Sequence, residues 1–219
     1  MSQRKVHFVE GEFYHVYNRG NSKQTIFVNK GDYERFQVGL YIANATNPFV
    51  FREAKKLDFW DFDRGEVLVD IHAYCLMPNH FHLLIAPCVE NGLQRFMQKL
   101  STSYSMYFNK KYDRTGALFE GRFKSQYVDS DEYLKYLYSY IHLNPVKLLD
   151  SQWKVTGVQS SAKTLDHLRH YTYSSLPDYM GWLDREERSI INGDMATAYF
   201  NHKGDWLQEM NDWLLNQPQ

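Results

Sequence analysis

Residues 66–86 read EVLVDIHAYCLMPNHFHLLIA, and this stretch decides the fold. The runs 66–76 and 80–86 are rich in residues that favour strands, and Met77-Pro78-Asn79 between them is a turn sequence. Two such runs joined by a short turn predict a β-hairpin. The hairpin is the element around which the rest of the chain is arranged.

The second strand of this hairpin carries two histidines. Side chains alternate across a strand, so His80 and His82 share one face while Phe81 and Leu83 point into the core beneath the other. Two neighbouring neutral imidazoles on a rigid strand form half of a site for a divalent metal. The alternative is a pair of surface or hydrogen-bonded histidines.

Two registers of the hairpin are open. A turn centred on Pro78 puts His72 on the face of the histidine pair, as a neighbour of the metal ligands, whereas a turn centred between Pro78 and Asn79 puts Cys75 there. Both registers keep Cys75 away from Cys88, so we expect no disulfide.

On either side of the hairpin, the sequence predicts three helices and two more strands. The third helix has Asp129 as its N-cap with Glu132 as the N3 partner, and Pro145 ends it. The order is strand, helix, strand, strand, helix, strand, helix, which predicts an α+β protein with a ferredoxin-like β-α-β-β-α-β antiparallel sheet and added C-terminal helices. The expected strands are 12–18, 66–76, 80–86 and 122–128, and the expected helices are 32–46, 92–112 and 129–144, with an irregular segment over 51–64.

The patterns weaken after residue 150. We therefore expect one domain over residues 1–150 and a mostly helical extension over residues 151–219. The extension is expected to dock through its tryptophans, which are Trp153, Trp182, Trp206 and Trp213.

Composition limits the class of protein. The 219 residues are 43% hydrophobic and carry a formal net charge of -1, so a sizeable core and a solvated surface are both available. No apolar run approaches the roughly 20 residues that cross a bilayer, and the N-terminal sequence lacks the apolar core of a secretory signal. Two cysteines are too few for a disulfide framework. We expect a cytoplasmic protein that does not enter the membrane.

Charge is distributed unevenly. Residues 93–127 contain seven basic and two acidic side chains, and their aromatic residues are interleaved with the basic ones. Basic groups contact phosphates and aromatic rings stack on unpaired bases, so this run suits single-stranded or hairpin nucleic acid; solvated and buried helix faces are the alternative. The candidate nucleic-acid-binding residues are Arg95, Lys99, Lys110, Lys111, Arg114, Arg122 and Lys124.

A stripe of tyrosines runs along the third predicted helix. Tyr133, Tyr136, Tyr140 and Asn144 recur at three- and four-residue intervals and so share one face. The Asn144 amide lies one turn beyond the Tyr140 phenol and could complete a metal site with two histidines. A packing face with its hydroxyl groups at the rim is the alternative.

Three segments together resemble the IS200-like single-tyrosine transposases of the HUH nuclease superfamily, and most closely the REP-associated tyrosine transposases. They are AYCLMPNHFHLL (73–84), GALFEGRFKS (116–125) and YSYIHLNPV (138–146). The resemblance covers residues 8–150, and the ferredoxin-like fold of the family agrees with the order of elements above.

The resemblance implies a set of roles. His80 and His82 would bind Mg²⁺ or Mn²⁺ with Asn144 as the third ligand, and Tyr140 would be the nucleophile. The implied reaction cleaves and transfers single-stranded, hairpin-bearing DNA through a 5′-phosphotyrosine intermediate. His142 faces elsewhere at two residues from Tyr140, and relatives resemble either monomers or homodimers.

Two other functions are alternatives to a transposase. Nucleotidyl hydrolases carry a third histidine in the strand motif, where this chain has Leu84. A non-catalytic, domesticated DNA-binding protein that recognises repeated hairpins remains an alternative, because an intact site can serve binding alone.

Overall fold

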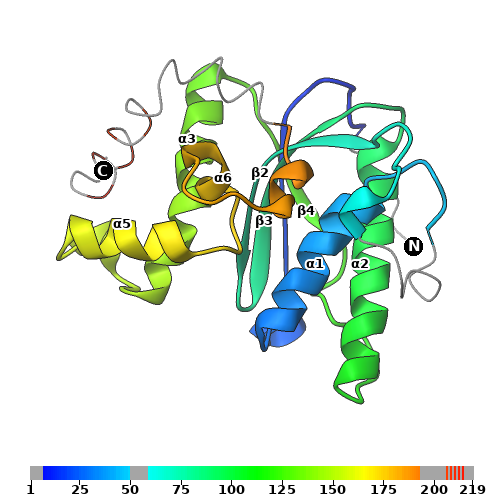
Figure 1. The fold of residues 1–219 in the computed structure, drawn as a ribbon, viewed down its shortest axis with the longest axis horizontal. Helices are drawn as coiled ribbons and strands as arrows, with labels where there is room; N and C mark the ends of the chain where they lie inside the picture. Colours follow the sequence, from blue (N-terminus) through cyan, green and yellow to red (C-terminus); the bar gives the residue numbers. More distant parts are fainter. Residues whose placement is uncertain are drawn as a thin grey trace.

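The computed structural model describes residues 7–49 and 59–192 and, beyond these, residues 206, 208, 210, 212 and 214. A four-stranded sheet forms its centre, with helices on both faces (Figure 1). The strands are β1 (Tyr14–Arg19), β2 (Val69–Met77), β3 (His80–Pro87) and β4 (Lys124–Tyr127), and the main helices are α1 (Lys30–Ala43), α2 (Gly92–Lys111), α3 (Asp131–Leu143), α4 (Trp153–Thr156), α5 (Ser161–His170) and α6 (Leu176–Met180). Short 3-10 turns include η3 (Asn144–Leu148) and η4 (Glu186–Ile190).

The sheet has the order β2-β3-β1-β4 with every neighbouring pair antiparallel. This is the ferredoxin-like order, so the predicted fold class is confirmed. The predicted strands and helices are all present, with ends that differ by a few residues. The irregular segment expected over 51–64 falls mostly outside the described residues.

The hairpin of β2 and β3 settles the register. Met77 pairs with His80 and Cys75 pairs with His82, which centres the turn between Pro78 and Asn79. Cys75 therefore shares the face of His82, and the alternative register, centred on Pro78, is wrong. A bulge between Ile71 and Ala73 removes His72 from the regular pairing. Cys75 and Cys88 are both free thiols, as expected.

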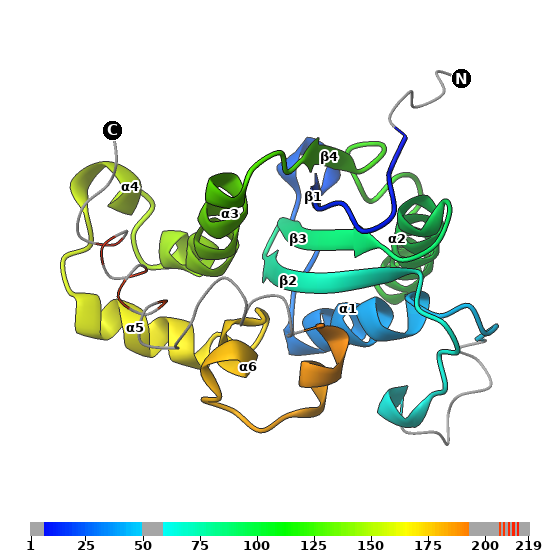
Figure 2. The same ribbon diagram turned by 90° about the horizontal axis from the view of Figure 1, so that it is seen from above.

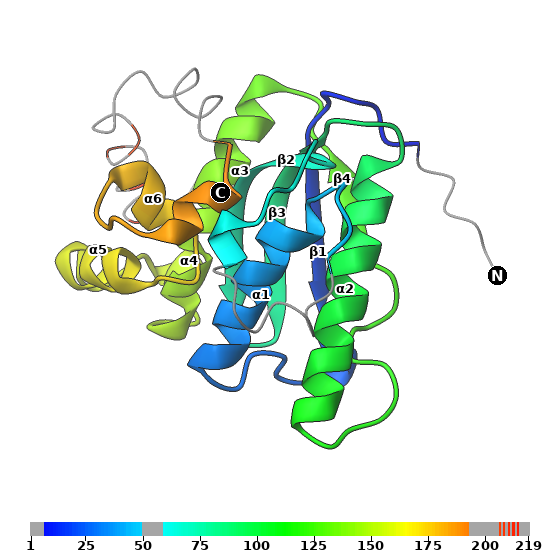
Figure 3. The same ribbon diagram turned by 45° about the vertical axis from the view of Figure 1, so that its right-hand side comes forward.

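The two faces of the sheet carry different helices. Helices α1 and α2 lie side by side on one face, where Phe81 and Leu83 join their core (Figures 1 and 3). Helix α3 packs on the other face against Ala73, Cys75 and Leu84. The face that carries the histidine pair is thus the face covered by α3.

The start of α3 differs from the prediction. Ser130 is the N-cap, with extended backbone geometry and a side-chain oxygen that accepts a hydrogen bond from the amide of Tyr133. Asp129 lies one residue too early to make this contact. Asp131 and Glu132 occupy the first turn, where negative charge favours the positive end of the helix dipole.

Residues after 150 extend the same core instead of forming a separate one. Trp153 and Trp206 are buried with residues of α3, and Trp182 packs at the edge of this cluster, whereas Trp213 lies outside the described residues. Helices α4, α5 and α6 lie beside α3 (Figure 2). The predicted domain division at residue 150 stays a prediction.

A segment that follows α5 covers the outer edge of β2. Ser174 forms an antiparallel bridge with Cys75, and the Leu76 amide donates to the Tyr173 carbonyl at 2.9 Å. Tyr171 also donates from its hydroxyl to the Leu76 carbonyl at 2.6 Å. Backbone hydrogen bonds to a strand edge, which sequence patterns do not reveal, therefore fasten the extension in addition to its tryptophans.

A buried ion pair fixes this segment. The Arg185 guanidinium lies 2.6 Å from the Asp178 carboxylate, and the side chains are 10% and 0% exposed. Arg185 also donates to the carbonyls of Thr172 and Ser174. In the part of the chain that the structure describes, no helix is long and apolar enough to span a membrane.

We expect Arg185→Ala to destabilise the fold by about 3–5 kcal/mol, because it leaves the Asp178 carboxylate buried without a partner. Urea unfolding followed by circular dichroism measures the loss. Lys163→Ala, which changes an exposed side chain of α5, is the matched control and should change the free energy of unfolding by under about 0.5 kcal/mol. Equal effects of the two substitutions would contradict the prediction.

Candidate active site

A polar cleft of about 320 Å³ opens where β1 and β3 meet the end of α3. It brings together side chains from β1, β3 and β4, from the tyrosine stripe of α3 and from the turns and loops between elements. Its lining consists of Tyr17, Asn18, Arg19, Lys23, Asn79, His80, His82, Glu120, Lys124, Tyr140 and Lys147.

The strand register positions the sheet side of this cleft. Cys75, His82, Tyr17 and Lys124 are direct partners across β2, β3, β1 and β4, so they form one row on the face toward α3. His80 pairs with Arg19 in the next row toward the turn. The histidine pair therefore lies at the centre of the sheet, where both neighbouring strands hold it.

A third histidine contacts the pair. His15 Nε2 lies 2.9 Å from His82 Nδ1, and the two rings stack with centroids 5.1 Å apart. Burial lowers the pKa of His15 to about 4 and, with neighbouring positive charge, lowers the pKa of His82 well below its usual range. Both rings are therefore neutral at pH 7.

His80 is oriented by its chain neighbour. His80 Nδ1 donates to the Asn79 side-chain oxygen at 2.6 Å, because an amide oxygen can only accept. The lone pair of His80 is therefore on Nε2. Burial, then the charges of Lys147 and Arg19, lower the pKa of His80 to about 4. Neutral imidazoles held by a second hydrogen bond are suited to bind a metal, so His80 and His82 fit as nitrogen ligands.

Tyr140 faces this pair from α3. Its ring centroid lies 5.5 Å from that of His82 and 5.9 Å from that of His15, with both contacts edge-on. Burial raises the pKa of Tyr140 above its usual range, and Tyr136 adds to the rise, while Asn144 opposes it. The structure thus brings the two histidines of the sheet and the phenol of the helix into one cleft.

The other tyrosines of α3 separate as helical geometry requires. Tyr136 stacks on Tyr140 with centroids 5.7 Å apart, and Tyr133 stacks on Tyr136 at 5.9 Å. Tyr138 is fully buried and contacts Trp206. Only Tyr140 of this stripe lines the cleft.

Asn144 is placed differently from the histidines. Its Nδ2 donates to the Tyr140 carbonyl at 2.8 Å, and its Oδ1 accepts from Lys147 Nζ at 3.4 Å. The side chain is buried and does not line the cleft. Among the described residues, no three His, Cys, Asp or Glu side chains cluster as metal ligands. The third-ligand role of Asn144 stays a prediction.

The predicted basic residues do not form one surface. Lys124 lines the cleft, whereas four others lie on α2, which packs on the opposite face of the sheet. Lys111 Nζ pairs with the fully buried Asp32 carboxylate at 2.6 Å and so has a structural contact. Those on α2 are Arg95, Lys99, Lys110 and Lys111, while Arg114 and Arg122 lie in the connection to β4.

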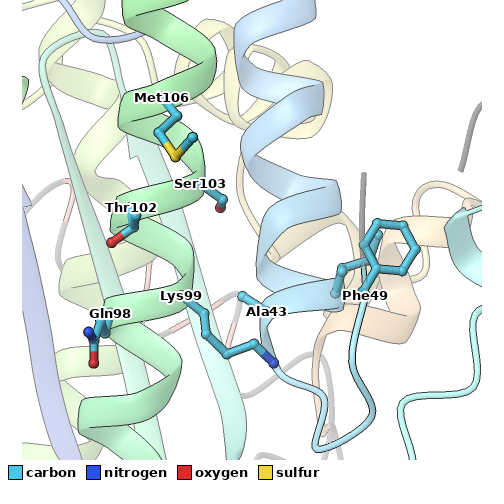
Figure 4. Close-up of a pocket in the computed structure, with 8 residues that line it drawn as sticks. Ala43, Phe49, Gln98, Lys99, Thr102, Ser103 and Met106 are labelled. Carbon is cyan, nitrogen blue, oxygen red and sulfur yellow. The ribbon is translucent and has the colours of Figure 1, made fainter. Parts of the chain in front are cut away.

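A second cavity of about 380 Å³ lies between α1 and α2 (Figure 4). Among the described residues, its lining includes Ala43, Phe49, Lys99 and Met106 but no histidine, cysteine or carboxylate. Lys99 donates there to the Ala45 carbonyl. Its lysine is held by this backbone contact, and the cavity contains neither the histidine pair nor Tyr140, so the polar cleft is the candidate active site.

Sequence analysis missed four residues near Tyr140. His15 and Tyr17 lie on β1, and their alternation in EFYHVYN is the pattern that could have placed them beside His82. Lys147 and Lys154 follow the tyrosine helix and contact the ring of Tyr140. Nothing in the local sequence distinguishes these two lysines from solvated ones.

His142 does not reach the cleft, in agreement with the sequence analysis. It is fully buried, and its Nε2 lies 2.7 Å from the Ser175 hydroxyl. Burial lowers its pKa to about 3. His142 is therefore a neutral residue of the core that joins α3 to the C-terminal segment.

The site thus combines an antiparallel ferredoxin-like sheet, a His-Phe-His strand at its centre and a tyrosine that faces this strand from a packed helix. Residues 65–144 match the family model described as "Transposase IS200 like". Over these residues the chain is similar to the IS200-like transposases.

The fold is also similar to that of a solved structure, a REP-associated tyrosine transposase bound to a REP hairpin. The two share 13% sequence identity with a TM-score of 0.51, and the alignment covers 89% of this chain and 93% of the other. At this identity the likeness shows the shared fold. No curated protein matches the sequence.

The depressed pKa of His142 predicts acid sensitivity. The folded protein holds this ring neutral down to about pH 3, whereas the unfolded chain protonates it near its usual value of 6.5. The stabilisation is present above pH 6.5 and is lost as pH falls toward 3, by up to about 1.4 kcal/mol per pH unit.

We therefore expect His142→Gln to be less stable than the wild type at pH 7 and to lose less further stability between pH 6.5 and 4. Urea unfolding across this pH range measures both. The exposed His170→Gln is the matched control and should keep the wild-type slope. A His142→Gln slope equal to that of the wild type would contradict the assignment.

Proposed function

We propose that this protein is a transposase that cleaves and rejoins single-stranded DNA beside a hairpin, with Tyr140 as the nucleophile. The observation that carries the proposal is the meeting of the Tyr140 ring and the His82 ring, 5.5 Å apart, in a cleft that His80 also lines. The residues come from α3 and from the central strand β3. Their convergence supports one reaction centre.

The phenol supports covalent catalysis. Attack of Tyr140 Oη on a phosphodiester would give a 5′-phosphotyrosine and a free 3′-hydroxyl, and the covalent bond would conserve the energy needed for rejoining. Burial raises the pKa of the Tyr140 phenol and so keeps it protonated at neutral pH. Positive charge around the phenol would favour the phenolate, which is the form that attacks phosphorus.

The histidine pair supports a metal site. His80 and His82 would hold Mg²⁺ or Mn²⁺ through neutral ring nitrogens, with Asn144 as the proposed third ligand. Such an ion supplies Lewis-acid polarisation of a phosphoryl oxygen. Asn79 and His15 would hold the two rings in place by the hydrogen bonds described above.

The charge of the cleft supports DNA as the substrate. Lys23, Lys124 and Lys147 line it together with Arg19, which is paired with Glu120. Basic side chains around a nucleophile attract and position a phosphate chain. The relative of the same fold is bound to a REP hairpin, and by analogy we infer hairpin-bearing DNA here.

We expect wild-type protein with Mn²⁺ and a hairpin-bearing oligonucleotide to give an SDS-stable adduct, and Tyr140→Phe to give none. Removing the phenolic oxygen removes the atom that would bond to phosphorus. The matched control is Tyr136→Phe, on the same stripe one turn away, which should retain the adduct. Gel electrophoresis of labelled DNA provides the measurement.

An adduct that persists in Tyr140→Phe would remove Tyr140 from this role. Hairpin binding without an adduct in the wild type would instead support the non-catalytic DNA-binding protein. The contact of Lys147 with the Asn144 side-chain oxygen favours that alternative, because it occupies the atom that would bind the metal.

Removal of the metal provides a second test. We expect EDTA to abolish the adduct and His80→Ala to weaken Mn²⁺ binding by at least about tenfold, because one of the two nitrogen ligands is lost. Electron paramagnetic resonance of free Mn²⁺ measures the affinity without DNA. His170→Ala is the control. Unchanged Mn²⁺ affinity in His80→Ala would exclude His80 as a ligand.

A further inference from the structure

Two ammonium groups converge on Tyr140 from segments that follow α3. Lys154 Nζ of α4 lies 4.4 Å from the centroid of the Tyr140 ring, and Lys147 Nζ of η3 lies 6.0 Å from it. Lys147 also lines the cleft with His80 and His82. The two lysine ammonium groups therefore lie beside the ring of Tyr140, and one of them also lies in the cleft of the histidine pair.

Neither lysine has a carboxylate partner within the described ranges. Lys147 donates to the neutral Asn144 amide oxygen, and Lys154 lies over the rings of Tyr140 and Trp153. Arg19 and Lys111, by contrast, are paired with Glu120 and Asp32.

The partial burial of these two lysines bears on their role. Both lysines are half-buried, and desolvation lowers the pKa of each. Burying a positive charge without a counter-ion is unfavourable unless an anion arrives to pair with it. A phosphodiester at the Tyr140 hydroxyl would be such an anion.

The reaction proposed above develops negative charge at the hydroxyl of Tyr140, whose ring these cations border. Tyr140 Oη bonds to phosphorus as the bond from phosphorus to O3′ breaks; the phenol loses its proton and O3′ gains one. Negative charge on the phosphoryl oxygens grows in between, and a fixed cation stabilises it more than it stabilises the substrate.

We propose that Lys147 is a catalytic residue that contacts the phosphate under attack, and that Lys154 is a positioning residue that holds the ring of Tyr140. This inference rests on the proposed function. Both lysines remain protonated and transfer nothing. Rejoining reverses this transfer and passes through the same kind of transition state, so cleavage and rejoining both depend on the two lysines.

The test separates binding from chemistry in the full-length protein. Affinity for a hairpin-bearing oligonucleotide is measured by fluorescence anisotropy, and single-turnover rates of adduct formation and of rejoining to a 3′-hydroxyl strand are measured at saturating DNA. The variants are Lys147→Gln, Lys147→Arg, Lys154→Gln and Lys154→Arg. Lys135→Gln, on an exposed position of α3, is the matched control, and thermal unfolding verifies that each variant folds.

We expect Lys147→Gln to slow adduct formation and rejoining alike by about 100- to 1,000-fold, while affinity falls by less than about tenfold. Lys154→Gln should slow both rates less, without changing affinity. The arginine variants should recover part of each rate because they keep the charge. Lys135→Gln should match the wild type.

Wild-type rates at saturating DNA in Lys147→Gln, or a loss of affinity alone, would overturn the catalytic role of Lys147. Equal rates in Lys154→Gln and Lys154→Arg would overturn the role of Lys154. No adduct in the wild type would overturn the proposed function itself, and this inference with it. The wild-type result therefore distinguishes the two failures.

Discussion

The antiparallel register of β3 between β2 and β1 is the constraint on which the site depends. It aligns Cys75, His82 and Tyr17 in one row and places His80 beside Arg19. A shift of one residue would turn both histidines into the core and bring Phe81 out toward α3. Hydrophobic burial against α1 and α2 prevents that shift, so the packing of one face holds the chemistry of the other.

Local patterns were sufficient for much of this architecture. The order of the elements, the hairpin turn and the common face of His80 and His82 follow from periodicity and turn residues, and a spacing of two residues on a helix turns Tyr138 away from Tyr140. The cap of α3 was missed by one residue because Asp129 and Ser130 are both good capping residues, and the entry of the chain from β4 decides between them.

Long-range contacts could not be predicted in the same way. His15 is brought to His82 by strand pairing across 67 residues, and Lys154 reaches Tyr140 only after the chain reverses beyond η3. The basic run also misled in part, because charge counted along the sequence does not show that Lys111 neutralises a buried carboxylate on the far face. A site built from several segments requires the fold before its members can be counted.

The segment along β2 has a consequence for assembly. By using the backbone groups of Tyr74 and Leu76, residues 173–175 remove one edge of the sheet from contact with other chains. Among the described strands, the other edge of the sheet is β4, which is four residues long and carries Lys124. Short, charged edge strands resist strand addition, so the sheet is protected from pairing edge to edge with neighbouring copies and aggregating.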